Sequence, residues 1–457
     1  MNKELNRLSV KIDIRFITDV ILSFFGLAIA AIYYLDLRSI NEVVVSYLII
    51  SLSLYACIVV RKNRLLLLLF GIILYANFSI CYVNYIKPIE GILVTSLAET
   101  TEAKIALLYL LMFISVLVGF LPKKVRSFSY KSPSFTGYKN NTYITVLLVI
   151  VLVLICMFGF IRPDSLGAER GNSSALYEYS VILFILAFYF SNKKKWLTNL
   201  ILVILVLYVF QDIAYGGRIT SIQLLLVAFF FVFNSKTKTS TLALVVFCML
   251  IFFLAFGGVR TQIWVDGFAA LFESFQRIMD TGFAWDTAYS AWHTSITFLQ
   301  FDSLISFSDH MYYLGQWLLS LVVGGSFVID SNIASVTHLY FAHSFGGVLP
   351  IYLAFYFGTP GVIAIALLVS IFVMVVNRFC GGLNLDFGIG KSALTLAMFY
   401  FIITVPRWYL YSPSPLIRGL VLMLAVSLVT LFIDLIFTKK RTNKLNNCLR
   451  RASKQIQ

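Results

Sequence analysis

The sequence predicts an all-α polytopic integral membrane protein with about twelve transmembrane helices, and three observations carry this prediction. Hydrophobic residues make up 60% and charged residues only 12% of the 457 residues, whereas soluble domains carry roughly 25% charged residues. The apolar runs are long and continuous, without the alternation of a β-barrel strand. The basic residues lie in short clusters between these runs. A soluble enzyme, a disordered regulator and a disulfide scaffold are thereby excluded.

The individual spans follow from length, because a helix needs about 20 apolar residues to cross a bilayer. The first fifteen residues are polar and lead into a full apolar run without a small-residue cleavage site, so we expect no cleavable signal peptide. The predicted spans are 15–35, 42–60, 65–86, 104–121, 142–161, 177–191, 196–213, 219–234, 239–258, 361–378, 391–406 and 415–437.

The charges predict the orientation of these spans. With a cytoplasmic N-terminus, the inside segments hold 26 of the 36 Lys and Arg residues but only three of the 21 acidic residues. This is the positive-inside pattern, and it places both termini in the cytoplasm. The net charge of +15 is therefore explained by topology and does not indicate binding to nucleic acid.

Two regions break the regular pattern. Residues 259–344 form a long outer segment, which we expect to be a folded helical cap because structureless loops of that length are unusual. Residues 345–378 are too long for one span and contain Gly358-Thr359-Pro360-Gly361, so we predict a re-entrant half-helix over 345–357. Alternatively, 313–328 and 345–357 both span, which gives fourteen helices.

The chain thus divides into four parts: nine spans in 1–258, the outer loop 259–344, the half-helix with three spans in 345–437, and a basic cytoplasmic tail, 438–457. The motifs that bind nucleotides are missing and no metal spacing is visible, so we predict neither a cofactor nor a metal. Chemistry would use the outer face and a substrate that is already activated. In a membrane, this points to a lipid diphosphate.

All four histidines fall on the predicted outer side. His343 is the strongest candidate, because Ser344 is a possible N-cap of the half-helix, where free N–H groups favour an anion. His343 could then hydrogen-bond a phosphate or move a proton. For His293, His310 and His338 a packing role is the simpler interpretation. The carboxylates of Glu273 and Asp330 are alternative bases.

Arginines on the outer side form a second group, and each needs a reason because cations are disfavoured there. The planar guanidinium suits bidentate recognition of phosphate. Glycines precede two of these arginines and would let the backbone approach a ligand. An ion pair with an outer carboxylate, or snorkelling to the interface, is the alternative role. The four arginines at the outer ends of spans are Arg218, Arg260, Arg407 and Arg418, and Arg277 lies further out.

Aromatic residues on the outer side could stack on sugar faces, although anchoring at the membrane interface explains each one alone. The candidates are Trp285, Trp292, Trp408, Tyr409 and Tyr411. The six cysteines lie in or beside apolar runs and basic clusters, so they are expected to be packing residues.

On these residues, the chain resembles the bacterial Wzy-type polymerases of oligosaccharide repeat units, which make O-antigen, capsule and related polymers. The resemblance covers most of the length through the span number, the late outer loop and the basic tail. Its motifs are Gly216-Gly217-Arg218, His343-Ser344 before the Gly358–Gly361 break, and Arg407 near the end of the penultimate span.

The resemblance implies a metal-independent glycosyltransferase of the bacterial inner membrane, active in lipopolysaccharide or other surface-polysaccharide synthesis. Undecaprenyl-diphosphate-linked oligosaccharides would be its substrates, and a chain-length-regulating membrane protein a possible partner. Arg218, Arg260, Arg407 and Arg418 would hold the donor diphosphate, and His343 would act as the base. His338, Ser344, Arg277 and Tyr411 are further candidates. A lipid-linked oligosaccharide flippase and an O-antigen ligase are the alternatives.

Overall fold

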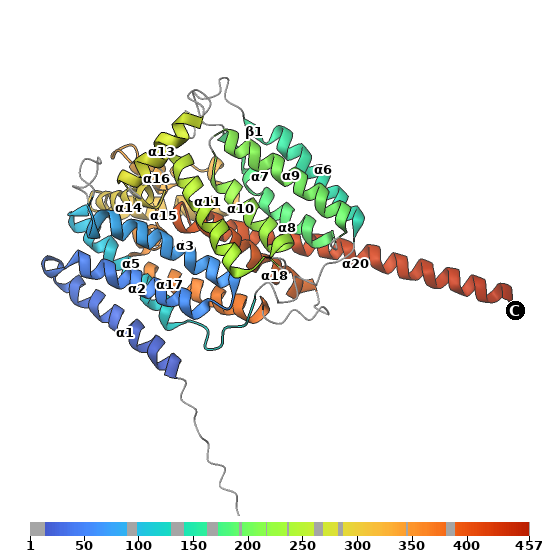
Figure 1. Cartoon of the computed structure of the whole chain (residues 1–457), viewed down its shortest axis with the longest axis horizontal. Helices are drawn as coiled ribbons and strands as arrows, with labels where there is room; N and C mark the ends of the chain where they lie inside the picture. The colour runs from blue at the N-terminus through green and yellow to red at the C-terminus, as the bar shows by residue number, and fades with distance from the viewer. Residues whose placement is uncertain are drawn as a thin grey trace, which may run out of the picture.

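The computed structural model describes residues 14–88, 98–128, 141–161, 172–191, 194–215, 217–234, 237–259, 268–281, 287–343, 346–380 and 389–456. These residues form eighteen α-helices. The strands that they contain are one short antiparallel pair, β1 (Phe160–Ile161) and β2 (Asn172–Ser173). The architecture is therefore all-helical, as predicted (Figure 1).

Seven of the helices are long and apolar enough to cross a membrane. They are α1 (Ile14–Leu35), α2 (Glu42–Val60), α3 (Arg64–Cys81) with the π-helical turn η2 (Tyr82–Ile86), α5 (Thr101–Gly119), α9 (Lys195–Ala214), α17 (Leu349–Cys380) and the first half of α20 (Ser414–Ile456). These are the helices of a multi-pass membrane protein.

Shorter apolar helices occupy the remaining predicted spans. They are α6 (Thr142–Phe158), α7 (Ala175–Glu178) with α8 (Ser180–Phe190), α10 (Ile219–Ala228) with the π-helical turn η3 (Phe229–Phe233), α11 (Thr239–Val259), and α18 (Ile389–Ile403), which is followed by the short helix α19 (Val405–Leu410). Each of the twelve runs chosen by length alone thus lies in a helix or in two successive helices. The tenth run, 361–378, is only the part of α17 that follows Gly358, and the twelfth, 415–437, is only the first half of α20.

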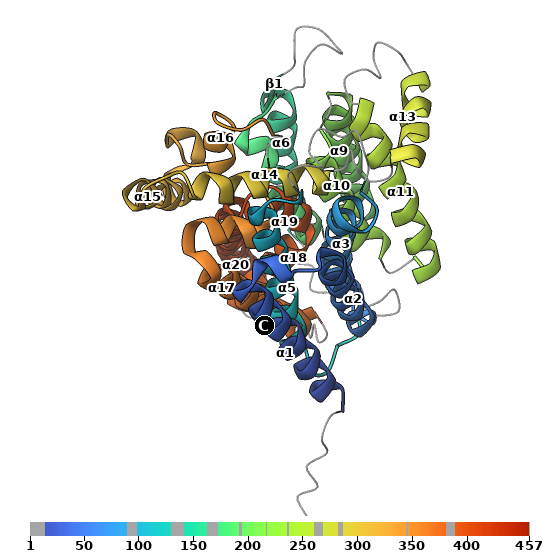
Figure 2. The same cartoon turned by 90° about the vertical axis from the view of Figure 1, so that its left-hand side faces the viewer.

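The predicted outer segment is folded into helices at the end of the bundle where α6 runs into β1 (Figures 1 and 2). Its helices are α13 (Phe268–Thr281), α14 (Thr287–Asp302), α15 (Phe307–Val323) and α16 (Ile333–Thr337), with the 3-10 turn η5 (Gly325–Phe327). In Figure 2, α14 runs across the bundle. It packs against α3, α5 and α17 and buries Trp292 completely. Through α14, this segment is therefore packed into the helical bundle.

The predicted break in α17 is present, but the first part of this helix starts later than expected. Gly358 has φ 62° and ψ −155°, which is outside the helical region and is tolerated by glycine. The helix begins at Leu349, whereas the sequence predicted a start at residue 345. Gly346 is the reason: its φ of 126° keeps this part of the chain out of a helix.

Polar contacts tie the helix ends together at two opposite ends of the bundle. At one end, which we name the basic end, Arg64 donates to the carbonyls of Asn234 and Thr237 at 3.0 and 2.8 Å. Arg126 donates to the Arg378 carbonyl at 2.7 Å there. The Asn234 and Arg378 carbonyls lie at the C-terminal ends of η3 and α17, where the helix dipole favours a cation, and the Thr237 carbonyl lies in the loop after η3.

At the other end, which we name the cap end, the contacts join side chains. Lys104 pairs with Glu42 at 3.1 Å, and Trp317 of α15 donates from Nε1 to Oγ of Ser414 at 3.1 Å. The second contact fixes α15 to the first turn of α20. The cap end also holds most of the residues that the sequence singled out.

Candidate functional site

Arg407 lies on α19, a six-residue helix whose position is fixed by buried hydrogen bonds. Tyr409 donates from its hydroxyl to Oδ1 of Asn77 at 2.9 Å, and Trp408 donates from Nε1 to the Phe401 carbonyl at 2.9 Å. The Arg407 guanidinium forms an ion pair with Glu178, and the two side chains are 21% and 30% exposed. The cation is thus anchored by the protein while remaining within reach of a ligand.

Arg418 and Tyr411 lie beside this ion pair. The charges of Arg418 and Arg407 both act on the Tyr179 hydroxyl, and the amide of Tyr411 donates to the Arg407 carbonyl at 3.0 Å. Within the described part of the chain, Arg418 has neither a hydrogen-bonding partner nor an ion pair. We name Glu178, Tyr179, Arg407, Tyr411 and Arg418 the cap-end cluster.

The loop that enters α17 reaches this cluster through its backbone. The amide of Gly347 donates to the Leu410 carbonyl at 3.1 Å, and a Cβ at Gly346 would come within 2.9 Å of the same oxygen. Earlier in the loop, Nε2 of His343 lies 2.9 Å from Oγ1 of Thr337. The ring centroids of His343 and His338 are 5.2 Å apart, edge to face. His343 is half-buried and belongs to the same region as α19.

The helix start on which the predicted anion site depends lies later in the chain than expected. Because α17 begins at Leu349, its N-terminus lies several residues after Ser344, the predicted N-cap, which itself falls outside the described residues. The Val348 amide already donates to Oγ of Ser295 at 2.7 Å, and Pro350 has no N–H to offer. Val348 and Pro350 therefore offer no free N–H group to an anion at the start of α17.

Arg218 is the residue that precedes α10. Its side chain binds α14, which in turn contacts the loop that enters α17. Its Nη1 donates to the Phe253 carbonyl at 3.2 Å and its Nη2 to Oγ1 of Thr287 at 3.0 Å. One helical turn further along α14, Cβ of Ala291 lies 3.7 Å from the position of a Cβ at Gly346. Since one turn rises about 5.4 Å, Arg218 binds α14 about one turn away from the loop that enters α17.

Gly217 has a structural role that differs from the predicted one. A Cβ at this position would lie 2.0 Å from Oδ1 of Asp212. The Asp212 carboxylate in turn accepts from the amide and hydroxyl of Ser221 at 2.9 and 2.8 Å. The close approach that this glycine permits is therefore to a carboxylate that caps α10, and not to a ligand.

Other candidates contribute less to the geometry. Arg260 lies outside the described residues, and so does the side chain of Arg277, which is on α13. Glu273 is exposed on α13. Asp330 has a left-handed φ of 56° and accepts from the Tyr312 hydroxyl at 3.4 Å.

The aromatic candidates for sugar stacking are mostly buried. Trp292, Trp408 and Tyr409 are each 0% exposed, so they pack in the core, Trp285 lies outside the described residues, and only Tyr411 is accessible. His293 is also buried, and neither of its ring nitrogens has a partner among the described residues. Burial lowers its pKa to about 4. His293 is therefore neutral near pH 7 and cannot hold an anion by charge.

Glu178, Tyr179 and Thr287 belong to the site but were not predicted from the sequence. Glu178 carried a usable signal, because it is an acidic residue at the outer end of a predicted span, where an outer arginine would find a partner. Nothing local could have paired it with Arg407, since the two residues are 229 positions apart. Thr287 gave no signal at all.

The chain matches no protein-family model, no curated protein and no solved structure. The chemistry of the site must therefore be argued from its own residues.

Proposed function

We propose that the protein is a polymerase of lipid-linked oligosaccharides in the bacterial cytoplasmic membrane. The observation that carries the proposal is the cap-end cluster, in which two arginines at the ends of membrane helices lie beside one accessible tyrosine and close to the loop of His343. Cations held at that depth are costly and mark ligand sites by default. A diphosphate is the ligand that such a pair suits best.

The proposal includes twelve spans with both termini in the cytoplasm, so that the basic end faces the cytoplasm and the cap end the outer side. Supporting this, the contacts across helix ends join segments that the charge pattern assigns to one side: Arg64 with Thr237, Arg126 with Arg378, and Arg407 with Glu178. A cysteine introduced at Phe307, which is 82% exposed, should react with an impermeant maleimide from outside. A cysteine at Arg61 should not.

In the proposed reaction, a hydroxyl oxygen of one lipid-linked repeat unit attacks the anomeric carbon of the sugar at the reducing end of the growing chain. A glycosidic bond forms, and the bond from that carbon to the diphosphate oxygen breaks. Undecaprenyl diphosphate leaves with the electron pair, and fixed cations stabilise its growing negative charge. Arg407 and Arg418 would bind this leaving group, with Arg218, Arg260 and Arg277 as further candidates.

The acceptor hydroxyl must lose its proton, and His343 is the candidate base. His338 and Ser344, which are close to it in sequence, are further candidates. Tyr411 would contact the ligand. General-base assistance is worth about 10²–10⁴-fold in rate. His343→Ala should therefore lower polymer formation by about that factor without weakening donor binding. His343→Gln separates the roles, because glutamine donates a hydrogen bond but takes no proton at neutral pH.

The decisive assay uses the purified protein in proteoliposomes with lipid-linked repeat units from its own cells. A polymerase yields a ladder of lengths and releases undecaprenyl diphosphate, with or without a chelator, since no metal is invoked. A flippase would move the lipid across the bilayer without releasing diphosphate. A ligase would transfer one chain to a second acceptor and make no ladder. Either of these outcomes overturns the proposal.

A further inference from the structure

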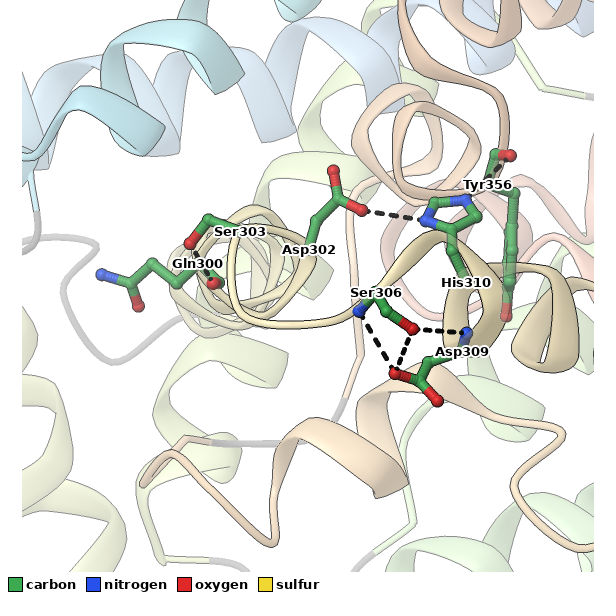
Figure 3. Close-up of polar contacts among 7 residues, drawn as sticks. All are labelled: Gln300, Asp302, Ser303, Ser306, Asp309, His310 and Tyr356. Atoms are coloured by element: carbon green, nitrogen blue, oxygen red, sulfur yellow. Dashed lines mark hydrogen bonds and ion pairs between the residues drawn. The ribbon is translucent and has the colours of Figure 1, made fainter.

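One side chain, His310, ties the turn between α14 and α15 to the break in α17 (Figure 3). Its Nδ1 lies 2.9 Å from Oδ1 of Asp302, the last residue of α14, and its Nε2 lies 3.2 Å from the carbonyl oxygen of Tyr356. The ring also stacks on Phe355, with centroids 5.0 Å apart and planes at 25°. A single imidazole on α15 thus contacts two other helices.

The Tyr356 carbonyl needs a donor because of the break. In a regular helix it would accept from the amide of residue 360, but Pro360 has no N–H. Gly358 also leaves the helical conformation, with φ 62°. A backbone carbonyl left without a donor in apolar surroundings costs free energy. His310 supplies the hydrogen bond that the sequence of α17 removes.

The two contacts have different requirements for protons on the ring. A neutral imidazole carries one N–H, whereas a carboxylate and a backbone carbonyl both only accept. Both hydrogen bonds can be made together only if both ring nitrogens carry protons.

We propose that His310 is an imidazolium latch that holds α15 and the end of α14 against the break in α17, and that opens when the proton is lost. Loss of the proton removes one of the two hydrogen bonds, so the latch is closed at low pH and weakens as pH rises. Its side chain is 19% exposed, which lets the proton exchange with water. This inference does not depend on the proposed function.

The other titratable groups near His310 do not replace it. The Asp309 carboxylate accepts from the amide and hydroxyl of Ser306 at 3.1 and 2.7 Å and lies below the ring in Figure 3, away from Asp302. From α5, the Tyr109 phenol acts on Asp302 electrostatically. Tyr313 follows one turn along α15, where its ring meets Phe301.

Hydrogen exchange followed by mass spectrometry tests the latch in the full-length protein in nanodiscs. In the wild type, protection of amides in 307–323 and 349–361, corrected for intrinsic exchange, should fall about three- to tenfold between pH 6 and pH 8.5, the size expected for one hydrogen bond. In His310→Phe, which keeps the ring stack, protection should be low and equal at both pH values. His338→Phe should keep the wild-type pH dependence.

A second variant keeps the test informative if His310→Phe does not fold. His310→Gln can donate to the Tyr356 carbonyl but does not titrate, so it should fold and show the same protection at both pH values. Two results would overturn the latch. One is a wild type that is equally protected at pH 6 and pH 8.5, and the other is a His310 variant that keeps the wild-type pH dependence.

Discussion

The arginines at the two ends of the molecule are held in different ways. At the basic end, Arg64 is 4% exposed, and its Nη1 and Nη2 donate to oxygens of Asn234 and Thr237, which follow η3. At the cap end, Arg407 meets a partly exposed carboxylate and Arg418 meets no partner among the described residues. A buried arginine whose Nη groups donate to backbone carbonyls serves the fold. An arginine with hydrogen-bonding capacity to spare is available to a ligand.

This comparison teaches why charge position alone is a weak guide to function. Both groups of arginine sit at helix ends, and both are conspicuous in the sequence between apolar runs. The two groups differ in how many hydrogen-bond acceptors surround each guanidinium. That number depends on the packing of helices that are distant in sequence. Four substitutions test which of these arginines stabilise the fold and which are available to a ligand.

The largest effect is expected for Arg407→Ala. It removes a cation from the proposed diphosphate site and leaves Glu178 without its partner, so polymer formation should fall by at least about 10²–10³-fold. Arg407→Lys should recover only part of the activity because the bidentate fork is lost. Activity is measured as polymer per folded protein. Arg38→Ala, at an exposed arginine on η1 (Leu37–Ser39), is the control and should remain active.

Arg418→Ala should separate function from stability most clearly. Because the described chain offers Arg418 no partner, its removal should leave the thermal midpoint within about 2 °C of the wild type, as for a surface substitution. Polymer formation should nevertheless fall by about 10²-fold. A normal polymer yield would show that Arg418 does not bind the diphosphate and would leave Arg407 as the binding residue of the cap-end cluster.

Arg64→Ala, at the basic end, should show the reverse pattern. Hydrogen bonds to a charged group contribute about 1.5–3 kcal/mol, and the variant should lose about that much stability, seen as a lower thermal midpoint in detergent. The activity of the protein that remains folded should equal that of the wild type. Arg61→Ala is the matched control, since Arg61 is exposed only three residues away. Loss of activity in folded Arg64→Ala would show that Arg64 serves function as well as stability.

Arg126→Ala should have the smallest effect. Its bond to the Arg378 carbonyl is exposed to solvent, and exposed electrostatic contacts are worth about 0–1 kcal/mol. Its backbone amide still donates to Oδ1 of Asn377 at 2.8 Å, so the loop stays attached. A destabilisation as large as that of Arg64→Ala would mean that burial does not distinguish the two arginines.

Part of the site was predictable and part was not. The place of Arg407 near the end of a predicted span could be predicted because apolar length is a local property of the chain. Its partner Glu178 could not, because that pairing joins residues 229 positions apart. The start of the half-helix was predicted too early: Gly346 has a φ of 126°, and a Cβ there would lie 2.9 Å from the Leu410 carbonyl oxygen of α19, a contact that local sequence does not reveal.

By itself, the sequence determined that the chain is all-helical, where its apolar helices run, and that α17 breaks between Gly358 and Gly361. These features depend on hydrophobic length and on the backbone limits of glycine and proline, which act within a few residues. Tertiary packing determines which arginines donate to backbone carbonyls and where α17 begins. It also places His310 beside the Tyr356 carbonyl, which lacks a helical donor because residue 360 is proline. Each of these is a pairing of hydrogen-bond donors with acceptors on distant segments, and only the packing of the helices brings such groups within 3 Å or so of each other.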